Sequence, residues 1–256
     1  DNINFFLGQI DYENKRYDEA LLHYQRIQQG TFVNVKTLNV SKALLKKYNL
    51  EKALSHIDKE IKIKNQNNLL NSLSLKLSIF EEIGESAGII NLSSQILQSF
   101  PNNERALYSR ALAYEKEGNI LSMSKDFDKM IKLNKYNSIA LNAYGYSLAL
   151  QNLHLDKSEK LIRKALDIRP GQAAILDSLA WVLYLKGSYK EAAKYSSLAY
   201  SKDQDPEIVE HHYLILLKNG NSNEAKYILN QSIKNNPNSE KLLKLLDNSK
   251  NAAIKL

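Results

Sequence analysis

The chain has 256 residues, and its 35 Lys and Arg against 28 Asp and Glu give a formal net charge of +7. It contains no cysteine, which excludes disulfides, thiolate nucleophiles and cysteine-type zinc sites, and no apolar run approaches the roughly 18 to 20 residues of a membrane-spanning helix. Only nine Gly and four Pro occur, a composition that favours helices over β-hairpins.

Prolines and glycines recur at regular intervals along the chain. Pro101, Pro170 and Pro237 are 69 and 67 residues apart, close to two periods of about 34, and each follows an amphipathic stretch that a proline would end. Glycines recur about 17 residues before these prolines or their expected places, where a left-handed residue suits the turn after a helix. They are Gly84, Gly118, Gly187 and Gly220. The spacing predicts a repeated unit of helix, turn, helix and proline.

Small and aromatic residues mark fixed positions within these units. In the first unit, Gly8, Tyr17, Ala20 and Tyr24 stand at positions 8, 17, 20 and 24. The sixth unit has Ala180, Gly187, Tyr189, Ala192 and Ala199 at positions 8, 15, 17, 20 and 27. This pattern resembles the tetratricopeptide repeat, a helical hairpin of 34 residues. Small residues at positions 8, 20 and 27 would let two helices approach closely, so a larger residue at Ala192 is expected to destabilise the fold.

The resemblance implies an all-α fold, an α-solenoid with a right-handed superhelical path, made of seven tandem hairpins and a closing helix. The predicted hairpins are residues 1–33, 34–69, 70–103, 104–137, 138–172, 173–205 and 206–238. Residues 239–256 follow as a capping helix with a frayed tail. No comparable cap precedes the first hairpin, so further helices or a tether are expected upstream.

The second and third hairpins depart most from the pattern. Ser41 and Glu60 occupy positions 8 and 27 of the second, and Leu77 and Ile89 occupy positions 8 and 20 of the third. These residues predict helices that lie further apart or cross at another angle. The polar stretch 62–68 between the two hairpins predicts a longer loop and a point of flexion.

No catalytic or metal-binding constellation is present in the sequence. There is no nucleophile elbow, no glycine-rich phosphate loop and no His-Glu-x-x-His motif, so we predict no enzyme activity, no cofactor and no metal. His211 and His212 are adjacent and would diverge by about 100° on a helix, which favours core or surface roles over shared ligation. Glu207 stands four residues before His211, and the spacing predicts a solvated ion pair.

The inner face of such repeats is formed mainly by positions 2, 5, 9, 12 and 13, and in the family this face usually binds extended peptides or a partner's helix. Five basic and seven acidic residues fall at these positions, a net charge of −2. They are Lys42, Lys46, Arg105, Lys116 and Lys218, against Glu13, Glu81, Glu82, Glu115, Asp177, Glu207 and Glu210. The excess of lysine therefore lies elsewhere, and nucleic-acid binding is not predicted.

The fifth and sixth hairpins share a duplicated block that carries the predicted binding residues. A shift of 35 residues lays Asn142 on Asp177 and Tyr146 on Trp181. Aromatic side chains beside polar anchors are typical of peptide-binding hot spots. The predicted partner-binding residues are Tyr108, Asn142, Tyr146, Asp177, Trp181 and Tyr184. Two alternatives remain open: the aromatic residues pack between neighbouring repeats, or Asn142 and Asp177 form a hydrogen bond between repeats.

The best-known peptide mode of the family holds a terminal carboxylate with Lys, Arg and Asn from three successive repeats. Arg105 and Asn142 are in suggestive places, but Asp177 would repel a carboxylate, so a different protein or peptide ligand is expected.

Residues 138–230 further resemble a group of exported bacterial tetratricopeptide proteins, many of them outer-membrane lipoproteins, some of which present substrates to a carboxyl-terminal processing protease. This implies a noncatalytic scaffold or adaptor on the periplasmic side of the bacterial envelope, with a cytoplasmic location as the alternative. Membrane attachment would come only from an upstream lipid anchor, which this chain lacks. Two other functions stay open: the substrate-recruiting arm of an enzyme whose catalytic domain lies outside this chain, and an oligomerisation spacer of an envelope assembly.

Overall fold

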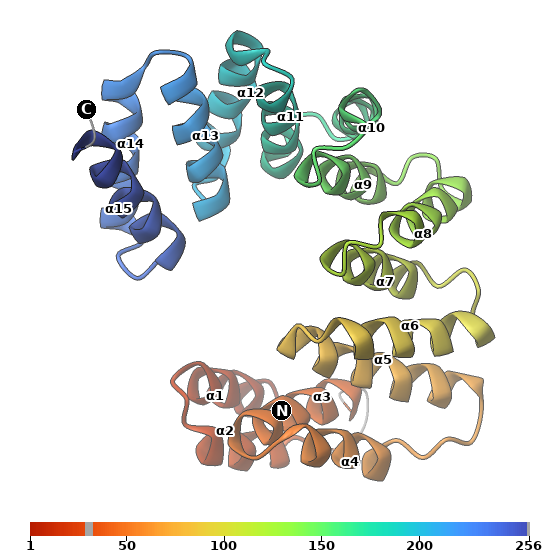
Figure 1. The fold of residues 1–256 in the computed structure, drawn as a ribbon. Coiled ribbons are helices and arrows are strands. Elements are labelled where there is room, and N and C mark those ends of the chain that lie inside the picture. Colours follow the sequence, from red (N-terminus) through yellow and green to blue (C-terminus); the bar gives the residue numbers. More distant parts are fainter. Residues whose placement is uncertain (29–32, 255–256) are drawn as a thin grey trace. The chain divides into compact units, whose positions relative to one another are not determined.

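The computed structural model describes residues 1–28 and 33–254, with side chains through 248. Within these residues the secondary structure is helical, and no strand is formed. The helices are α1 (Asn2–Glu13), α2 (Tyr17–Gln25), α3 (Val33–Lys47), α4 (Leu50–Glu60), α5 (Gln66–Ile83), α6 (Ser86–Ser99), α7 (Glu104–Lys116), α8 (Ile120–Leu133), α9 (Ser138–Leu150), α10 (Leu155–Ile168), α11 (Ala173–Leu185), α12 (Tyr189–Lys202), α13 (Pro206–Lys218), α14 (Ser222–Asn235) and α15 (Glu240–Ile254) (Figure 1).

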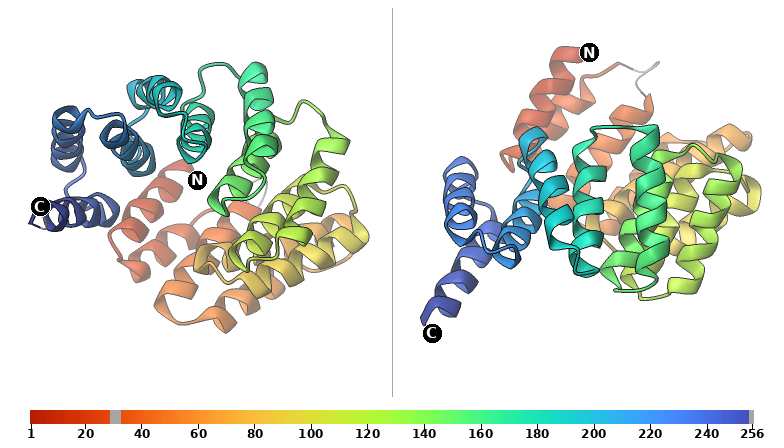
Figure 2. Two further views of the ribbon diagram at one scale, coloured as in Figure 1. Left: turned by 45° about the horizontal axis from the view of Figure 1, so that its top comes forward. Right: turned by 90° about the horizontal axis from the view of Figure 1, so that it is seen from above.

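The helices pair in sequence as antiparallel hairpins, from α1/α2 to α13/α14, and α15 follows the last pair (Figure 2). The predicted all-α array of about seven hairpins with a closing helix is therefore confirmed. The chain divides into two compact units, Asp1–Lys129 and Met130–Leu256, with the division inside α8. The second unit contains α9 to α15, and it carries the duplicated block.

The turns inside the hairpins have the predicted glycine geometry. Gly84, Gly118, Gly187 and Gly220 have φ values of 66°, 70°, 78° and 86°, in the left-handed region that a residue with a Cβ atom adopts at a cost. In the fifth hairpin the corresponding turn has no glycine, and Asn152 and His154 adopt positive φ values of 52° and 48°. The extra length of this hairpin therefore lies in the α9–α10 turn.

Small residues bring helices close together in the second unit. A Cβ atom on Gly145 of α9 would lie 2.6 Å from Cγ1 of Ile162 and 2.9 Å from the carbonyl oxygen of Ser158, both on α10. The Ser158 hydroxyl donates a hydrogen bond of 2.6 Å to the Gly145 carbonyl across the same contact. Ala180 and Ala192 are fully buried between α11 and α12. The expected size limit at these positions follows from helix backbones in near contact.

The predicted long loop at 62–68 is wrong in its second half. Helix α5 begins at Gln66, because the Asn65 side chain accepts a hydrogen bond from the Asn68 backbone N–H and caps the helix. The second and third hairpins begin at Val33 and Gln66, before the predicted starts at 34 and 70. A run of polar residues thus forms the first turn of a long helix once its free N–H groups have a capping acceptor.

Helix α15 covers the last hairpin through Leu242 and Leu245, which are buried with side chains of α13 and α14. Its backbone stays helical through Ile254, while residues 255–256 of the predicted frayed tail lie outside the described residues. None of the helices in the described part of the chain combines the length and hydrophobicity that crossing a bilayer requires.

Candidate partner-binding surface

A row of five aromatic rings in the second unit lies on α9, α11 and α13, the first helices of three successive hairpins, and on the start of α12. Tyr146 of α9 lies 6.2 Å from His211 of α13, which stacks on Trp181 of α11 with ring centroids 4.2 Å apart. Trp181 stacks in turn on Tyr184 at 5.0 Å, and Tyr184 meets Tyr189 of α12 at 5.7 Å. Trp181 and Tyr184 are half-buried. We call these five residues the aromatic row.

His211 of the row forms a buried pair with Asp177, between α13 and α11. Asp177 Oδ2 and His211 Nδ1 are 2.8 Å apart, and the two side chains are only 7% and 6% exposed. They are 34 residues apart, one repeat length, so the repeat brings them to adjacent helices. Burial raises the pKa of the Asp177 carboxyl; His211 opposes this shift, while Glu207 and Asp205 add to it.

The interrepeat partner of Asp177 is therefore His211, and the hydrogen bond considered between Asn142 and Asp177 is not formed. Asp177 Oδ1 and Asn142 Oδ1 are both buried without a hydrogen-bond partner among the described residues. The predicted ion pair between Glu207 and His211 is also wrong. Glu207 instead accepts a hydrogen bond of 2.7 Å from the Tyr146 hydroxyl of α9.

His212 is a core residue, one of the two roles that the sequence left open. It is 2% exposed, its Nδ1 lies 2.9 Å from the Ser196 hydroxyl, and its ring stacks on Tyr200 at 5.2 Å. Burial lowers its pKa. The two adjacent histidines thus serve two different helix contacts, His211 with α11 and His212 with α12.

One end of the aromatic row opens into a pocket of about 400 Å³, which we call the acidic pocket. Its lining residues are Asn142, Tyr146, Ala174, Asp177, Ser178, Asp203, Asp205, Glu207 and Ile208. Four carboxylates line it, and no lysine or arginine does. Within the described residues, Asp203, Asp205 and Glu207 form no ion pair with a basic side chain, since their contacts are to backbone N–H groups and to Tyr146.

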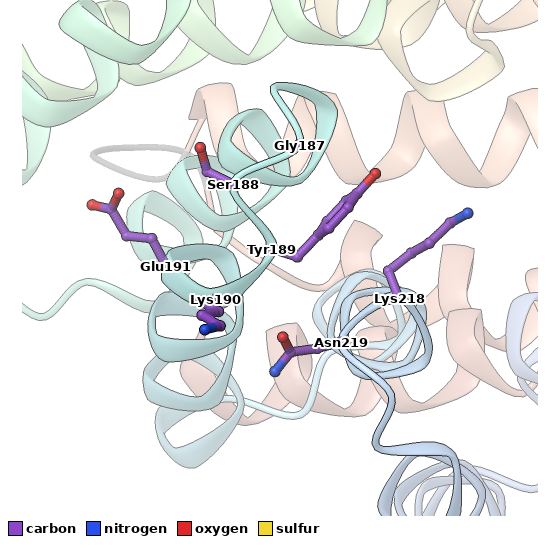
Figure 3. A pocket seen from close by; sticks show the side chains of 7 residues that line it. All are labelled: Gly187, Ser188, Tyr189, Lys190, Glu191, Lys218 and Asn219. Atoms are coloured by element: carbon purple, nitrogen blue, oxygen red, sulfur yellow. The ribbon is translucent and has the colours of Figure 1, made fainter.

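The other end of the row reaches a second pocket, of about 530 Å³, at the turn between α11 and α12. It is lined by Gly187, Ser188, Tyr189, Lys190, Glu191, Lys218 and Asn219. Figure 3 shows Tyr189 and Lys218 extending in the same direction from neighbouring helices. Glu191 forms an ion pair with Arg163 at 2.7 Å. The other charged side chains that line this pocket are Lys190 and Lys218, so its charge is positive. The two ends of the row therefore carry opposite charge.

The first unit arranges its inner charges differently. Lys42 and Lys46 of α3 bind Glu82 of α5 at 3.0 and 3.2 Å, and Tyr12 of α1 donates to the same carboxylate. A similar ion pair joins the first helices of the third and fourth hairpins, where Arg105 of α7 binds Glu81 of α5 at 2.9 Å. These basic and acidic side chains neutralise one another between adjacent helices, which the sequence count of charges could not show.

Of the predicted binding residues, five belong to one surface: Asn142, Tyr146, Asp177, Trp181 and Tyr184. Tyr108 is on α7 in the first unit, where it packs edge to face on Phe127, with ring centroids 6.2 Å apart. Burial raises the pKa of its phenol, with a smaller contribution from Glu115. It is not part of the aromatic row.

Three residues of this surface were not predicted from the sequence. His211 was assigned no role in it, although its distance of one repeat from Asp177 is the signal that links them. Asp203 and Asp205 lie in the α12–α13 turn, outside the inner-face positions that were considered. Among the described residues, no group of three or more His, Asp or Glu side chains is arranged to hold a metal ion.

Comparisons with known proteins agree with this architecture. The tetratricopeptide repeat family model matches residues 214–239, the second half of α13 through the turn after α14. The TPR repeat-containing protein PA4667 of Pseudomonas aeruginosa is 26% identical over 211 residues. That match covers 82% of this chain, which spans about a third (36%) of the length of this relative.

Two solved structures share the fold. A tetratricopeptide repeat protein from Parabacteroides merdae has a TM-score of 0.68 at 17% identity, over 96% of this chain and 97% of that one. PilW, described as a widely conserved type IV pilus biogenesis factor, has a TM-score of 0.66 at 17% identity, over 85% of this chain and all of that one. The repeat pattern, the family-model match and the curated relative support the tetratricopeptide repeat family for this chain, and the two solved structures support its fold.

Proposed function

We propose that this protein is a noncatalytic interaction scaffold that holds an extended segment of a partner protein along the aromatic row of its second unit. The tetratricopeptide fold is consistent with a protein-binding role in general. The aromatic row is the observation that carries the specific proposal, because the half-buried rings of Tyr146, Trp181 and Tyr184 come from two successive hairpins and are joined through the buried His211 ring of the third.

Aromatic side chains suit this role because each one buries a large area on binding and loses little conformational entropy. Stacking on His211 and Tyr184 already fixes the Trp181 ring, which lowers the entropic cost of binding further. The charged groups at the two ends would then set the direction of the bound segment. In the first unit, by contrast, Glu81 and Glu82 are engaged by neighbouring basic residues.

The test uses short random peptides displayed on phage and selected on the immobilised protein. Trp181 is the only tryptophan of the chain, so its fluorescence reports binding of each synthesised peptide at this surface. We expect Tyr184→Ala to weaken the selected peptides by about tenfold or more, as for a hot-spot aromatic residue. Tyr184 is preferred to Tyr146 and Trp181 because those two contact Glu207 and His211 between repeats.

Tyr227→Ala is the matched control, since Tyr227 is 65% exposed on the outer helix α14. It should leave peptide affinity unchanged. If Tyr184→Ala and Tyr227→Ala lose peptide affinity equally, or if both keep it at unchanged thermal stability, the aromatic row is not the binding surface.

We further propose that the scaffold works on the periplasmic side of a bacterial envelope, as an adaptor that presents protein substrates to a protease. This rests on the resemblance of residues 138–230 to exported tetratricopeptide proteins. Fractionation of cells that express the whole gene product, followed by protease treatment of spheroplasts, tests the location. Protection from protease in intact spheroplasts would place it in the cytoplasm instead.

A further inference from the structure

We propose that the acidic pocket receives a cationic side chain of the bound partner, with arginine as the best fit. This inference rests on the proposed function and names the chemistry of the segment that the scaffold holds. The pocket adjoins the aromatic row at Tyr146, so one residue of a segment lying on the row can enter it.

A buried hydrogen-bond acceptor, Asp177 Oδ1, lies at the wall of the pocket. Asp177 is 5% exposed and lines the pocket, and its Oδ2 is held by His211 while Oδ1 has no hydrogen-bond partner among the described residues. A buried carboxylate oxygen without a partner is costly, so a donor supplied by a ligand would relieve that cost. Asn142 Oδ1, on the facing helix α9, is a second buried acceptor in the same condition.

The negative charge around this acceptor is not compensated by basic side chains of the described residues. Asp203, Asp205 and Glu207 come from the α12–α13 turn and the start of α13, and within the described residues none forms an ion pair with a basic side chain. Elsewhere on the inner helices, carboxylates such as Glu81, Glu82 and Glu210 are paired with Arg or Lys. The acidic pocket lacks such a cation, and a partner can supply it.

The geometry favours an organic cation over a metal ion. The carboxylates are spread around a space of about 400 Å³, and the described residues contain no group of three or more ligands that could hold a metal. A guanidinium group presents five N–H donors in one plane, so it can bind more than one of the carboxylates that line the pocket at once. An ammonium group has three donors around a single atom and reaches fewer of them.

The experiment examines the composition of the peptides selected on the wild-type protein. We expect arginine or lysine to be enriched at one position of the peptides whose binding depends on Tyr184. Each selected peptide that carries arginine is then synthesised with citrulline in its place, which keeps the shape of the arginine side chain and removes its charge. Titration by Trp181 fluorescence should show affinity about ten- to a hundredfold weaker for the citrulline form.

A charge-neutralised variant places the effect in the acidic pocket. D203N/D205N/E207Q keeps hydrogen-bonding side chains at all three positions, and it should abolish the preference for arginine over citrulline.

The matched control is D167N/E240Q/D247N, which neutralises the same number of exposed carboxylates of the second unit away from the acidic pocket. It should keep the preference for arginine. If both variants lose the preference for arginine equally, the preference arises from long-range electrostatics and the pocket assignment is wrong.

The outcomes separate this inference from the proposed function. Selected peptides that depend on Tyr184 but carry no basic residue would overturn the cation pocket and leave the scaffold proposal standing. If no peptide is selected at all, both the cation pocket and the scaffold proposal are refuted. A saturable fluorescence response to calcium chloride alone, lost in D203N/D205N/E207Q, would replace the peptide cation by a metal ion.

Discussion

Gly145 provides a direct test of how closely α9 and α10 approach. In Gly145→Ala, the added methyl group would meet Ile162 Cγ1 at 2.6 Å, Ser158 O at 2.9 Å and Ile162 Cδ1 at 3.1 Å. Ordinary carbon contacts are about 3.5 to 4.0 Å, so the helices must separate by several tenths of an ångström or Ile162 must leave its position. A change of the Ile162 rotamer cannot relieve the contact with Ser158, because that oxygen belongs to the backbone.

The size of the effect follows from two opposing contributions. Overpacking of a close contact costs about 1 to 3 kcal/mol, and alanine in place of a helical glycine returns about 0.5 to 1 kcal/mol. Separation of the helices would also lengthen the 2.6 Å hydrogen bond from the Ser158 hydroxyl to the Gly145 carbonyl. We therefore expect a net destabilisation of about 1 to 2 kcal/mol, which corresponds to a fall in the melting midpoint of roughly 2 to 8 °C.

Thermal unfolding followed by far-ultraviolet circular dichroism measures this change, and urea unfolding gives the free energy. Lys160→Ala, at an exposed position of α10, is the control and should change stability by less than about 0.5 kcal/mol. An unchanged or raised midpoint for Gly145→Ala would refute the close contact, since only the gain in helix propensity would then remain.

Three further predictions concern packing, charge and capping. Ala192→Leu should cost about 1 to 3 kcal/mol in urea unfolding because Ala192 is fully buried, whereas Lys194→Leu at an exposed position should be tolerated; equal effects would contradict the packing argument. The pKa of the Asp177 carboxyl is raised in the folded protein, where His211, Glu207 and Asp205 face it. Its favourable contribution to the free energy of unfolding is therefore full at pH values below the usual pKa of 3.8, and it is lost as the pH rises through the folded-state pKa. Asp177→Asn should therefore gain stability relative to the wild type as pH rises through that window, and a parallel pH dependence of the two proteins would contradict this. Asn65→Ala should cost about 1 kcal/mol through loss of the α5 cap, and hydrogen exchange at the first turn of α5 should accelerate, with no change at α13.

The hairpins could be predicted from sequence because their determinants are local. A glycine with positive φ ends the first helix, a proline follows the second, and the spacing of small residues repeats with the length of a hairpin. The start of α5 was missed for a local reason of another kind. The stretch 62–68 reads as a loop by composition, and the capping bond from Asn68 N–H to Asn65 decides that its second half is helical.

The candidate surface was predicted only in part, because its members depend on contacts between hairpins. Trp181 and Tyr184 were recognised as aromatic inner-face residues, but their stacking with His211 depends on how α11 packs against α13. The structure is compatible with both partner binding and packing between repeats. Tyr146 and Trp181 contact His211 of another repeat, and both rings remain only half-buried. Whether they bind a partner stays a prediction.

The sequence by itself determined the kind of fold, the number of hairpins and the residue types at their turns, since these follow from helix propensity and from periodic small, apolar and turn residues. Only the tertiary structure decided which charges are neutralised. Glu82 lies next to Lys42 and Lys46. Asp177 lies next to His211 and keeps one oxygen unpaired. Ion pairing depends on distances of a few ångströms between side chains of different repeats, and a count of charges along the chain does not contain those distances.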